Sequence, residues 1–218
     1  MIIKIDPEIV PYDNLIRGLC MTPYYGHTHG CPNYGCKEGC PPNNLIDKIF
    51  DFSKEMYIIY TTFPIGKFAE RMRKNHPDWK ETVYPDHPKK TYEFRDKIIS
   101  KLKEKHPEWP EEYFPKINDE RWTSSRDWYN PRRWQAIARK EHSIELETFI
   151  QKYPGLTINR FPEAHGINLT GLMHNIGIEL SWQWPPIHNI KNNSYIVSVA
   201  GHLKKTIKNI GIDNKYRN

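Results

Sequence analysis

All four cysteines of this 218-residue chain fall in one stretch, CMTPYYGHTHGCPNYGCKEGCPP, at positions 20–42. The same stretch holds four glycines and four prolines, a composition typical of an irregular loop. Because no cysteine lies elsewhere, the thiols indicate one shared role, and the rest of the fold must be arranged around the loop that carries them. The four residues are Cys20, Cys31, Cys36 and Cys40.

The cellular compartment decides between disulfides and metal ligands. The first ten residues, MIIKIDPEIV, lack the charged and apolar regions of a secretory signal. The longest apolar run, at 56–63, is much shorter than the roughly 20 residues that cross a bilayer. We therefore expect a cytoplasmic protein with no membrane segment, in which thiols stay reduced. In that setting, clustered cysteines indicate metal ligands before they indicate disulfides.

The cysteine spacing, C-x10-C-x4-C-x3-C, favours an iron–sulfur cluster over zinc. Structural zinc sites usually present two pairs of ligands about two to four residues apart. Cys36 and Cys40 fit one such pair, but Cys20 and Cys31 make a poor second pair. A cluster tolerates irregular spacing because its ligands bind different iron atoms. Proline directly follows Cys31 and Cys40, as in the Cys-Pro step of ferredoxin motifs. We predict a 4Fe-4S cluster, with zinc and metal-free thiols as the alternatives.

Two histidines in the same loop leave the number of cysteine ligands open. His27 and His29, in GHTHG, can replace one cysteine, donate hydrogen bonds to cluster sulfurs, or be ordinary polar loop residues. Four cysteine ligands fill the coordination of a cubane and favour electron transfer or a structural role. Three leave one iron open to bind a substrate as a Lewis acid. The predicted ligand set for the cofactor is all four, Cys20, Cys31, Cys36 and Cys40.

Outside the loop, hydrophobic patterning predicts an α/β (α+β) fold. Apolar runs rich in β-branched and aromatic residues predict strands, and helical periodicity with capping residues predicts helices between them. The order of loop, helix and strand favours a small central mixed sheet flanked by helices. The predicted strands are 2–5, 56–63, 179–184 and 194–203, and the predicted helices begin at 45 and cover 131–153 and 169–175.

The middle of the chain, 64–130, is dense in charge, proline and tryptophan. HPDW at 76–79 and HPEW at 106–109 form a weak HPxW repeat. Each copy follows a basic stretch that predicts a helix stopped by proline. We therefore expect an inserted helical cap subdomain. The predicted division is an α/β core at 1–63 and 131–218, with the metal-binding loop at 20–42, and the cap at 64–130.

Charge and histidine patterns are the other candidate signs of a functional site. The net charge is +6, and part of the excess lies in a basic C-terminal tail that can touch RNA or an acidic partner. A solvated terminus explains the same residues more simply, so a nucleic-acid partner is disfavoured. His142 and Glu145, three residues apart on the long predicted helix, are interpreted as an ordinary surface pair rather than an acid and a base.

The motif CPNYGCKEGCPPNN at 31–44 is similar to the Cys-Pro-x-Tyr-Gly and Cys-Pro-Pro signature of an uncharacterised family of predicted metal-binding proteins, a domain of unknown function common in anaerobic archaea and bacteria. HSIELETFI at 142–150 resembles the long helix of that family, and PEAHGINLTGLMHNIGIEL at 162–180 resembles its closing segment. The resemblance implies iron–sulfur binding, most directly through Cys31 and Cys40 and then through Cys20. Cys36 stands where the family often lacks a cysteine.

The chain departs from this family in two places. Members usually carry a second cysteine cluster before the closing segment, whereas this chain has YPGLTINRFPEAHG there. The middle subdomain is also larger than the resemblance implies. Loss of a second cluster argues against an electron relay, and an added cap fits an enclosed substrate site.

These features predict a 4Fe-4S cluster-binding protein that uses its cluster for substrate activation, sulfur transfer or redox chemistry. An enzyme of this kind would be an oxidoreductase or a sulfur transferase of the desulfidase type, with a small-molecule substrate or a redox partner. The alternative is a zinc-stabilised module that binds RNA or a protein through the aromatic cap and the basic tail. The sequence contains no glycine-rich phosphate loop, Ser-His-Asp order or HExxH motif.

Overall fold

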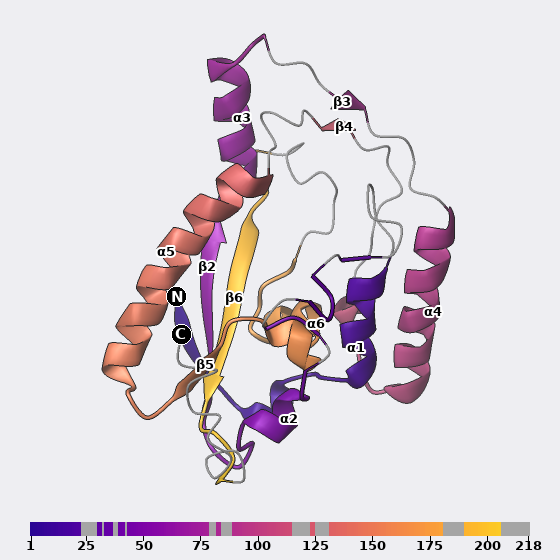
Figure 1. Ribbon diagram of the computed structural model, residues 1–218, viewed down its shortest axis with the longest axis vertical. Helices are drawn as coiled ribbons and strands as arrows, with labels where there is room; N and C mark the ends of the chain where they lie inside the picture. The colour runs from indigo at the N-terminus through magenta and orange to yellow at the C-terminus, as the bar shows by residue number, and fades with distance from the viewer. Residues whose placement is uncertain are drawn as a thin grey trace.

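The computed structural model describes residues 1–22, 30–31, 33–36, 39–41, 43–78, 82–83, 89–114, 123–124, 131–180 and 190–205. Its central feature is a four-stranded sheet with a long helix along one face and short helices on the other (Figure 1). The strands, in their order across the sheet, are β1 (Ile2–Ile5), β2 (Met56–Phe63), β6 (Ser194–Gly201) and β5 (Thr157–Asn159).

Six α-helices and four 3-10 turns accompany the sheet in the described ranges, together with a two-stranded ribbon of β3 (Thr82–Val83) and β4 (Thr123–Ser124). The helices are α1 (Asn14–Gly18), α2 (Ile46–Ile49), α3 (Ile65–Asn75), α4 (Lys89–Lys105), α5 (Pro131–Lys152) and α6 (Leu169–Asn175). The 3-10 turns are η1 (Pro7–Ile9), η2 (Leu19–Met21), η3 (Glu111–Tyr113) and η4 (Pro162–His165).

β2 and β6 form the centre of the sheet. They pair antiparallel over their whole lengths, from Met56 opposite Gly201 to Phe63 opposite Ser194. The first five residues of β2 are all buried, because helices cover both faces of the sheet at this strand. Burial on both faces explains why MYIIYTTF begins as a continuous apolar run rather than an alternating one.

One face of the sheet packs against α5. Alternate residues of β2, Tyr57 and Ile59, meet Leu146 and Phe149, which lie three residues apart on the helix and therefore share a face. The Tyr57 and Phe149 rings are 5.4 Å apart in an edge-on arrangement. Full burial of side chains this large contributes roughly 1.5–3 kcal/mol each, so this seam anchors α5.

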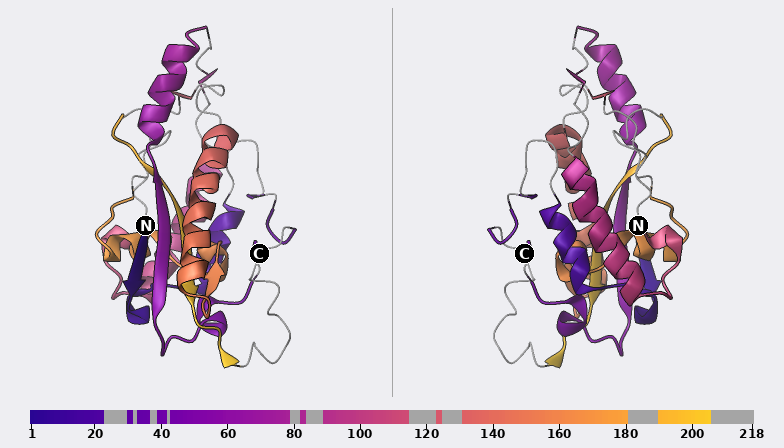
Figure 2. Two further views of the ribbon diagram at one scale, coloured as in Figure 1. Left: turned by 90° about the vertical axis from the view of Figure 1, so that its left-hand side faces the viewer. Right: turned by 90° about the vertical axis from the view of Figure 1, so that its right-hand side faces the viewer.

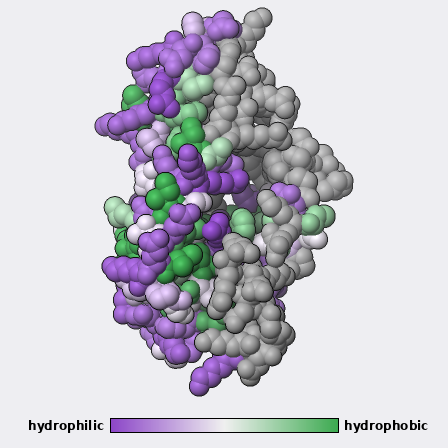
Figure 3. All heavy atoms as spheres, turned by 60° about the vertical axis from the view of Figure 1, so that its left-hand side comes forward, coloured by the Kyte–Doolittle hydropathy of each residue, from purple (hydrophilic) through white to green (hydrophobic). Residues whose placement is uncertain are grey.

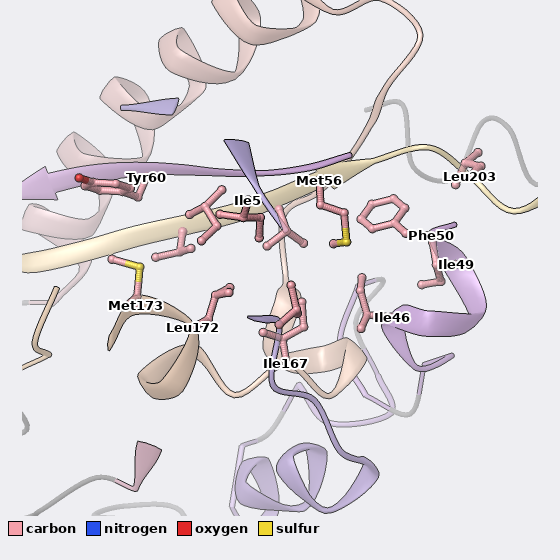
Figure 4. Packing of buried hydrophobic residues seen from close by; sticks show 14 residues of the cluster. Ile5, Ile46, Ile49, Phe50, Met56, Tyr60, Ile167, Leu172, Met173 and Leu203 are labelled. Atoms are coloured by element: carbon pink, nitrogen blue, oxygen red, sulfur yellow. The ribbon is translucent and has the colours of Figure 1, made fainter. Parts of the chain in front are cut away.

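The other residues of β2 point into a second cluster on the opposite face (Figure 4). Met56 and Ile58 pack there against Ile46 of α2 and against Leu172 and Met173 of α6. All five side chains are fully buried. This cluster matters for the site, because α2 begins shortly after the last cysteine and α6 follows η4.

Two helices of the central region pack on different parts of the core (Figures 1 and 2). α3 continues directly from β2, and its apolar face packs with Phe63 and Trp134, whose rings stack at 5.7 Å. α4 lies beside α1, with Leu102 packed against Ile16. α3 and α4 each end one residue before an HPxW histidine, so the predicted helix stops are confirmed. The cap subdomain at 64–130 stays a prediction.

The predicted α/β fold class, with a small central sheet flanked by helices, is confirmed. The expectation of mixed strand directions is corrected, because each of the three pairings in the described sheet is antiparallel. The helix predicted from 45 is only the single turn Ile46–Ile49. Of the strand predicted at 179–184, Glu179 and Leu180 are not in a strand, and the remainder lies outside the described residues.

The surface around α5 is mostly hydrophilic. Figure 3 turns this side of the molecule forward and shows apolar residues gathered among hydrophilic ones. α5 itself exposes Ile137, Ile144 and Ile150. Within the described ranges, no helix is both long and apolar enough to cross a membrane.

Candidate functional site

The first cysteine is positioned by a capped helix. The Asp13 side chain caps α1, because its Oδ1 accepts a hydrogen bond of 2.7 Å from the backbone N–H of Leu15. α1 runs directly into η2, which carries Cys20. Cys20 therefore sits at the end of a rigid element rather than in the free part of the loop.

A close backbone contact brings the second cysteine to the first. The N–H of Cys31 donates to the carbonyl of Cys20 at 2.8 Å. Gly30 has φ +83°, and a Cβ there would lie 2.6 Å from the backbone of Met21. Only glycine fits this position, because any other side chain would meet both a strained backbone and immovable atoms.

Cys36 lies on a tight turn in the middle of the loop. Tyr34 N–H donates to the carbonyl of Cys31 at 3.0 Å, and Cys36 N–H donates to that of Asn33 at 3.1 Å. The N–H of Gly35 then donates to the carbonyl of Pro41 at 2.6 Å, which folds the end of the loop back toward its middle. Cys36 is exposed on this turn, whereas Cys20, Cys31 and Cys40 are partly buried.

The segment 161–166, which contains η4, holds the loop from the far end of the chain. A Cβ added at Gly39 would lie 2.5 Å from the Phe161 ring, so the loop backbone rests directly on that ring. His165, which is buried, donates from Nδ1 to the carbonyl of Asn44 at 2.7 Å. Asp13 N–H donates to the carbonyl of Gly166 at 2.8 Å. The segment therefore touches the chain on both sides of the cysteines.

The electrostatics of Cys20 identify its neighbours. Burial of the side chain, with Cys31, Glu163 and Cys40 nearby, raises the pKa of the Cys20 thiol to about 11. At neutral pH this thiol is protonated, and it must lose its proton before it can bind a metal. The thiols of Cys31 and Cys40 and the carboxylate of Glu163 therefore lie within electrostatic reach of Cys20.

Three of the four predicted ligands lie in one neighbourhood, and a glutamate that the sequence did not suggest acts on the first of them. Cys20, Cys31 and Cys40 share one neighbourhood, and none of the four cysteines forms a disulfide. Glu163 of η4 contributes to the raised pKa of the Cys20 thiol, and burial raises the pKa of the Glu163 carboxyl itself. Its only sequence signal is a place in the segment PEAHG, which carries no metal-binding pattern by itself. His27 and His29 lie outside the described residues.

Thiols are the donor type that iron–sulfur clusters use. Within the described ranges, no three His, Cys, Asp or Glu side chains form a group that could hold a single metal ion. Ligands of a cluster bind separate iron atoms, so they need to surround a larger object rather than converge on one point. Three partly buried cysteines in one neighbourhood supply the soft thiolate ligands that iron–sulfur clusters use.

A second polar cluster joins α4 to the base of the site. Oδ2 of the buried Asp13 accepts a hydrogen bond of 3.0 Å from Nε2 of His106 and another from Lys105. Burial alone would raise the pKa of the Asp13 carboxyl, but these bonds and the one from Leu15 lower it below its usual value. The His106 ring stacks on Trp109 at 4.1 Å. The HPEW motif thus fixes the end of α4 to the cap of α1.

His142 is not the surface residue that its sequence context suggests. It is 5 % exposed and lies between two hydroxyl groups, with Nδ1 3.0 Å from Thr61 Oγ1 and Nε2 2.8 Å from Ser198 Oγ. Burial, with smaller contributions from Arg160 and the amino terminus, lowers the pKa of His142 to about 4. The side chain is therefore a neutral bridge between α5 and the two central strands.

Comparison with known proteins gives no assignment: no family model matches the chain, and no curated protein or solved structure does so. The resemblance to the predicted metal-binding family therefore stays a proposal.

Proposed function

We propose that this protein binds a 4Fe-4S cluster in its cysteine loop, in the cytoplasm, as the resembled family of predicted metal-binding proteins is thought to do. The observation that carries the proposal is the grouping of Cys20, Cys31 and Cys40, which come from a helix end, a glycine-dependent contact and a folded-back turn. Three separate local structures converge on one place, which supports a common ligand for the three thiols.

The residues that follow Cys40 hold the backbone of the loop next to α1. The Asn43 side chain donates to the carbonyl of Cys40 at 2.7 Å, and the Arg17 guanidinium donates to the carbonyl of Asn43. The first bond closes a turn after Cys40, and the second ties that turn to α1, which carries Arg17. A bound cluster would supply electron transfer or an iron that polarises a substrate, which suits substrate activation, sulfur transfer or redox chemistry.

Anaerobic purification tests the proposal directly. The protein should be brown, with broad visible absorption, and should contain about four iron and four sulfide per chain. Cys31→Ser should lose most of this iron while keeping the far-ultraviolet circular dichroism of the wild type. Thr148→Ser, a change on the exposed side of α5, serves as the control that should keep the full complement.

A colourless protein with one zinc per chain would contradict the proposal. It would favour the zinc-stabilised module that binds RNA or a protein partner. Retention on a heparin column that falls steeply with salt would add support for the nucleic-acid form of that alternative.

A further inference from the structure

Two stretches of the cysteine loop lie against each other at Cys20 and Cys31. The N–H of Cys31 donates to the carbonyl of Cys20 at 2.8 Å. Gly30, just before Cys31, packs so closely on Met21, just after Cys20, that an added Cβ would lie 2.6 Å from the Met21 Cα. Two successive residues of each stretch are therefore in backbone contact, which fixes the two cysteines relative to each other.

This contact suits a disulfide bond. Residues joined by backbone hydrogen bonds across two extended stretches have Cα atoms roughly 5.5 Å apart. Disulfides join residues whose Cα atoms are about 4.4–6.8 Å apart, so Cys20 and Cys31 can be bridged without a large movement of the backbone. Both side chains are partly buried rather than enclosed, so a small oxidant can reach them. Burial is the main cause of the raised pKa of the Cys20 thiol and Cys31 is the next, which agrees with this proximity.

The other two cysteines are held by different contacts. The N–H of Cys36 donates to the carbonyl of Asn33 at 3.1 Å, within a single turn. The carbonyl of Cys40 accepts a hydrogen bond of 2.7 Å from the Asn43 side chain. Both contacts are local in the sequence and lead away from the other cysteines. The backbone geometry therefore favours the first two cysteines as the pair that oxidation joins.

We propose that Cys20 and Cys31 form a reversible disulfide in the metal-free protein, and that this bond withholds both thiols from a metal. The disulfide concerns the metal-free chain alone, whereas its effect on metal binding rests on the proposed cluster binding. In cytosolic proteins, transient disulfides serve as redox sensors. Because a metal binds thiolates and not a disulfide, oxidation of the pair and metal binding exclude each other.

Hydrogen peroxide is an oxidant of the class that this reaction needs. One thiolate of the pair attacks a peroxide oxygen, the O–O bond breaks, and a sulfenic acid and a hydroxide ion result. The second thiolate attacks the sulfenic sulfur, so the S–S bond forms, the S–O bond breaks and a second hydroxide leaves. The two protons that the thiols have lost convert the hydroxides to water, and the peroxide has taken up two electrons. A dithiol reductant reverses the bond by thiol–disulfide exchange.

Peptide mapping of the metal-free protein tests the pairing. Reduced protein is treated with about one equivalent of hydrogen peroxide, alkylated and digested without reduction. Trypsin and chymotrypsin together place the four cysteines in four peptides, because they cleave after Tyr25, Tyr34 and Lys37. At least about four-fifths of the cross-linked chains should carry the bond between Cys20 and Cys31. A dominant link between any other pair, or no link within the chain, would overturn the inference.

Two cysteine variants check this assignment. Cys31→Ser should lower the yield of intramolecular cross-links at least about fivefold, because it removes the thiol held against Cys20. Cys36→Ser changes an exposed cysteine and should keep the wild-type yield. Equal yields in the two variants would contradict the proposed pair.

Two glycines provide a matched test of the backbone contact. Gly30 and Gly35 both have left-handed φ, +83° and +70°, but a Cβ at Gly35 would have nothing within 4 Å. Gly30→Ala should push the two stretches apart and slow disulfide formation at least about tenfold, whereas Gly35→Ala should keep the wild-type rate. Far-ultraviolet circular dichroism checks that both variants keep the fold. Equal rates would show that the contact does not bring the thiols together.

The effect of bound metal separates this inference from the proposed function. Metal-free wild type, and wild type reconstituted anaerobically with iron and sulfide, are treated briefly with diamide, which takes up two electrons and two protons as a hydrazine. The reconstituted protein should form less than about one-fifth of the disulfide that the metal-free protein forms. Equal yields would refute the exclusion of metal by the disulfide. A chain that forms the disulfide but takes up no iron would refute only the cluster, and one that takes up iron but forms no disulfide would refute only this inference.

Discussion

His142 should make the folded protein sensitive to acid. The side chain is neutral, buried and bonded to hydroxyls on both central strands, so a proton added to it would place a charge between α5 and the sheet. Its pKa is about 4 in the folded protein against 6.5 in an ordinary environment. Between these two values the unfolded chain binds a proton at this position and the folded chain does not.

The direction and size of the effect follow from that difference. The contribution of neutral His142 to the free energy of unfolding is fully present above pH 6.5. It is lost as the pH falls toward 4. Integrated from pH 7.5 to 4.5, the shift corresponds to about 2.5 kcal/mol at most. Arg160 and the amino terminus, both exposed, supply part of the shift and are screened by salt. We therefore expect a loss of about 2 kcal/mol at physiological ionic strength.

Urea unfolding of the metal-free protein at the two pH values measures this loss. His142→Gln can still bond a hydroxyl but does not titrate, so its free energy of unfolding should fall by about 2 kcal/mol less than that of the wild type. His202→Gln, at a half-buried histidine after β6, is the control and should lose as much as the wild type. Equal losses in the wild type and His142→Gln would refute the reasoning.

Three further predictions follow from the geometry around the cysteine loop. Gly166 and Gly177 both have φ near 80°, but a Cβ at Gly166 would lie 2.7 Å from the carbonyl oxygen of Asp13, whereas nothing lies within 4 Å at Gly177. Gly177→Ala should lower the free energy of unfolding by about 1–2 kcal/mol, and Gly166→Ala should lower it by at least about 1 kcal/mol more. Equal losses would contradict the close approach of Asp13 to Gly166. Asp13→Asn keeps a capping oxygen but loses the charge that faces His106 and Lys105. Chemical denaturation should therefore show a free energy of unfolding lower by about 1–3 kcal/mol. An unchanged denaturation midpoint would count against this cluster. With its pKa raised to about 11, roughly one Cys20 thiol in a thousand is a thiolate at pH 8 in the metal-free protein. Iodoacetamide should therefore modify the exposed Cys36 well before Cys20, as followed in a mass-spectrometric time course. The reverse order would disprove the buried thiol.

Local patterns predicted the main elements closely. The strand at 56–63 and the helix at 169–175 have the predicted limits, and the long helix ends one residue before the predicted 153. These signals are local, because β-branched and aromatic runs, helical periodicity and the Pro-Gly stop act over a few residues. They predict an element wherever packing does not oppose them.

Packing opposed the predictions at two places. Phe50 leaves the helical path after α2 and is fully buried in a bridge with Leu203, which ends the helix after one turn. After α6, Gly177 takes the left-handed conformation and Ile178 N–H donates back to Met173, so the chain turns where a strand was predicted to begin. Both outcomes depend on contacts that no local pattern contains.

The sequence by itself determined the chemistry available at the site, because clustered thiols in a glycine- and proline-rich loop indicate metal ligands wherever they fold. Only the tertiary structure decided which groups meet. It left Cys36 exposed on a turn, packed the 161–166 segment against the cysteine loop, and buried His142 between two strands. Composition and spacing indicate the chemistry of which each side chain is capable. Long-range packing decides which side chains lie close enough to act together.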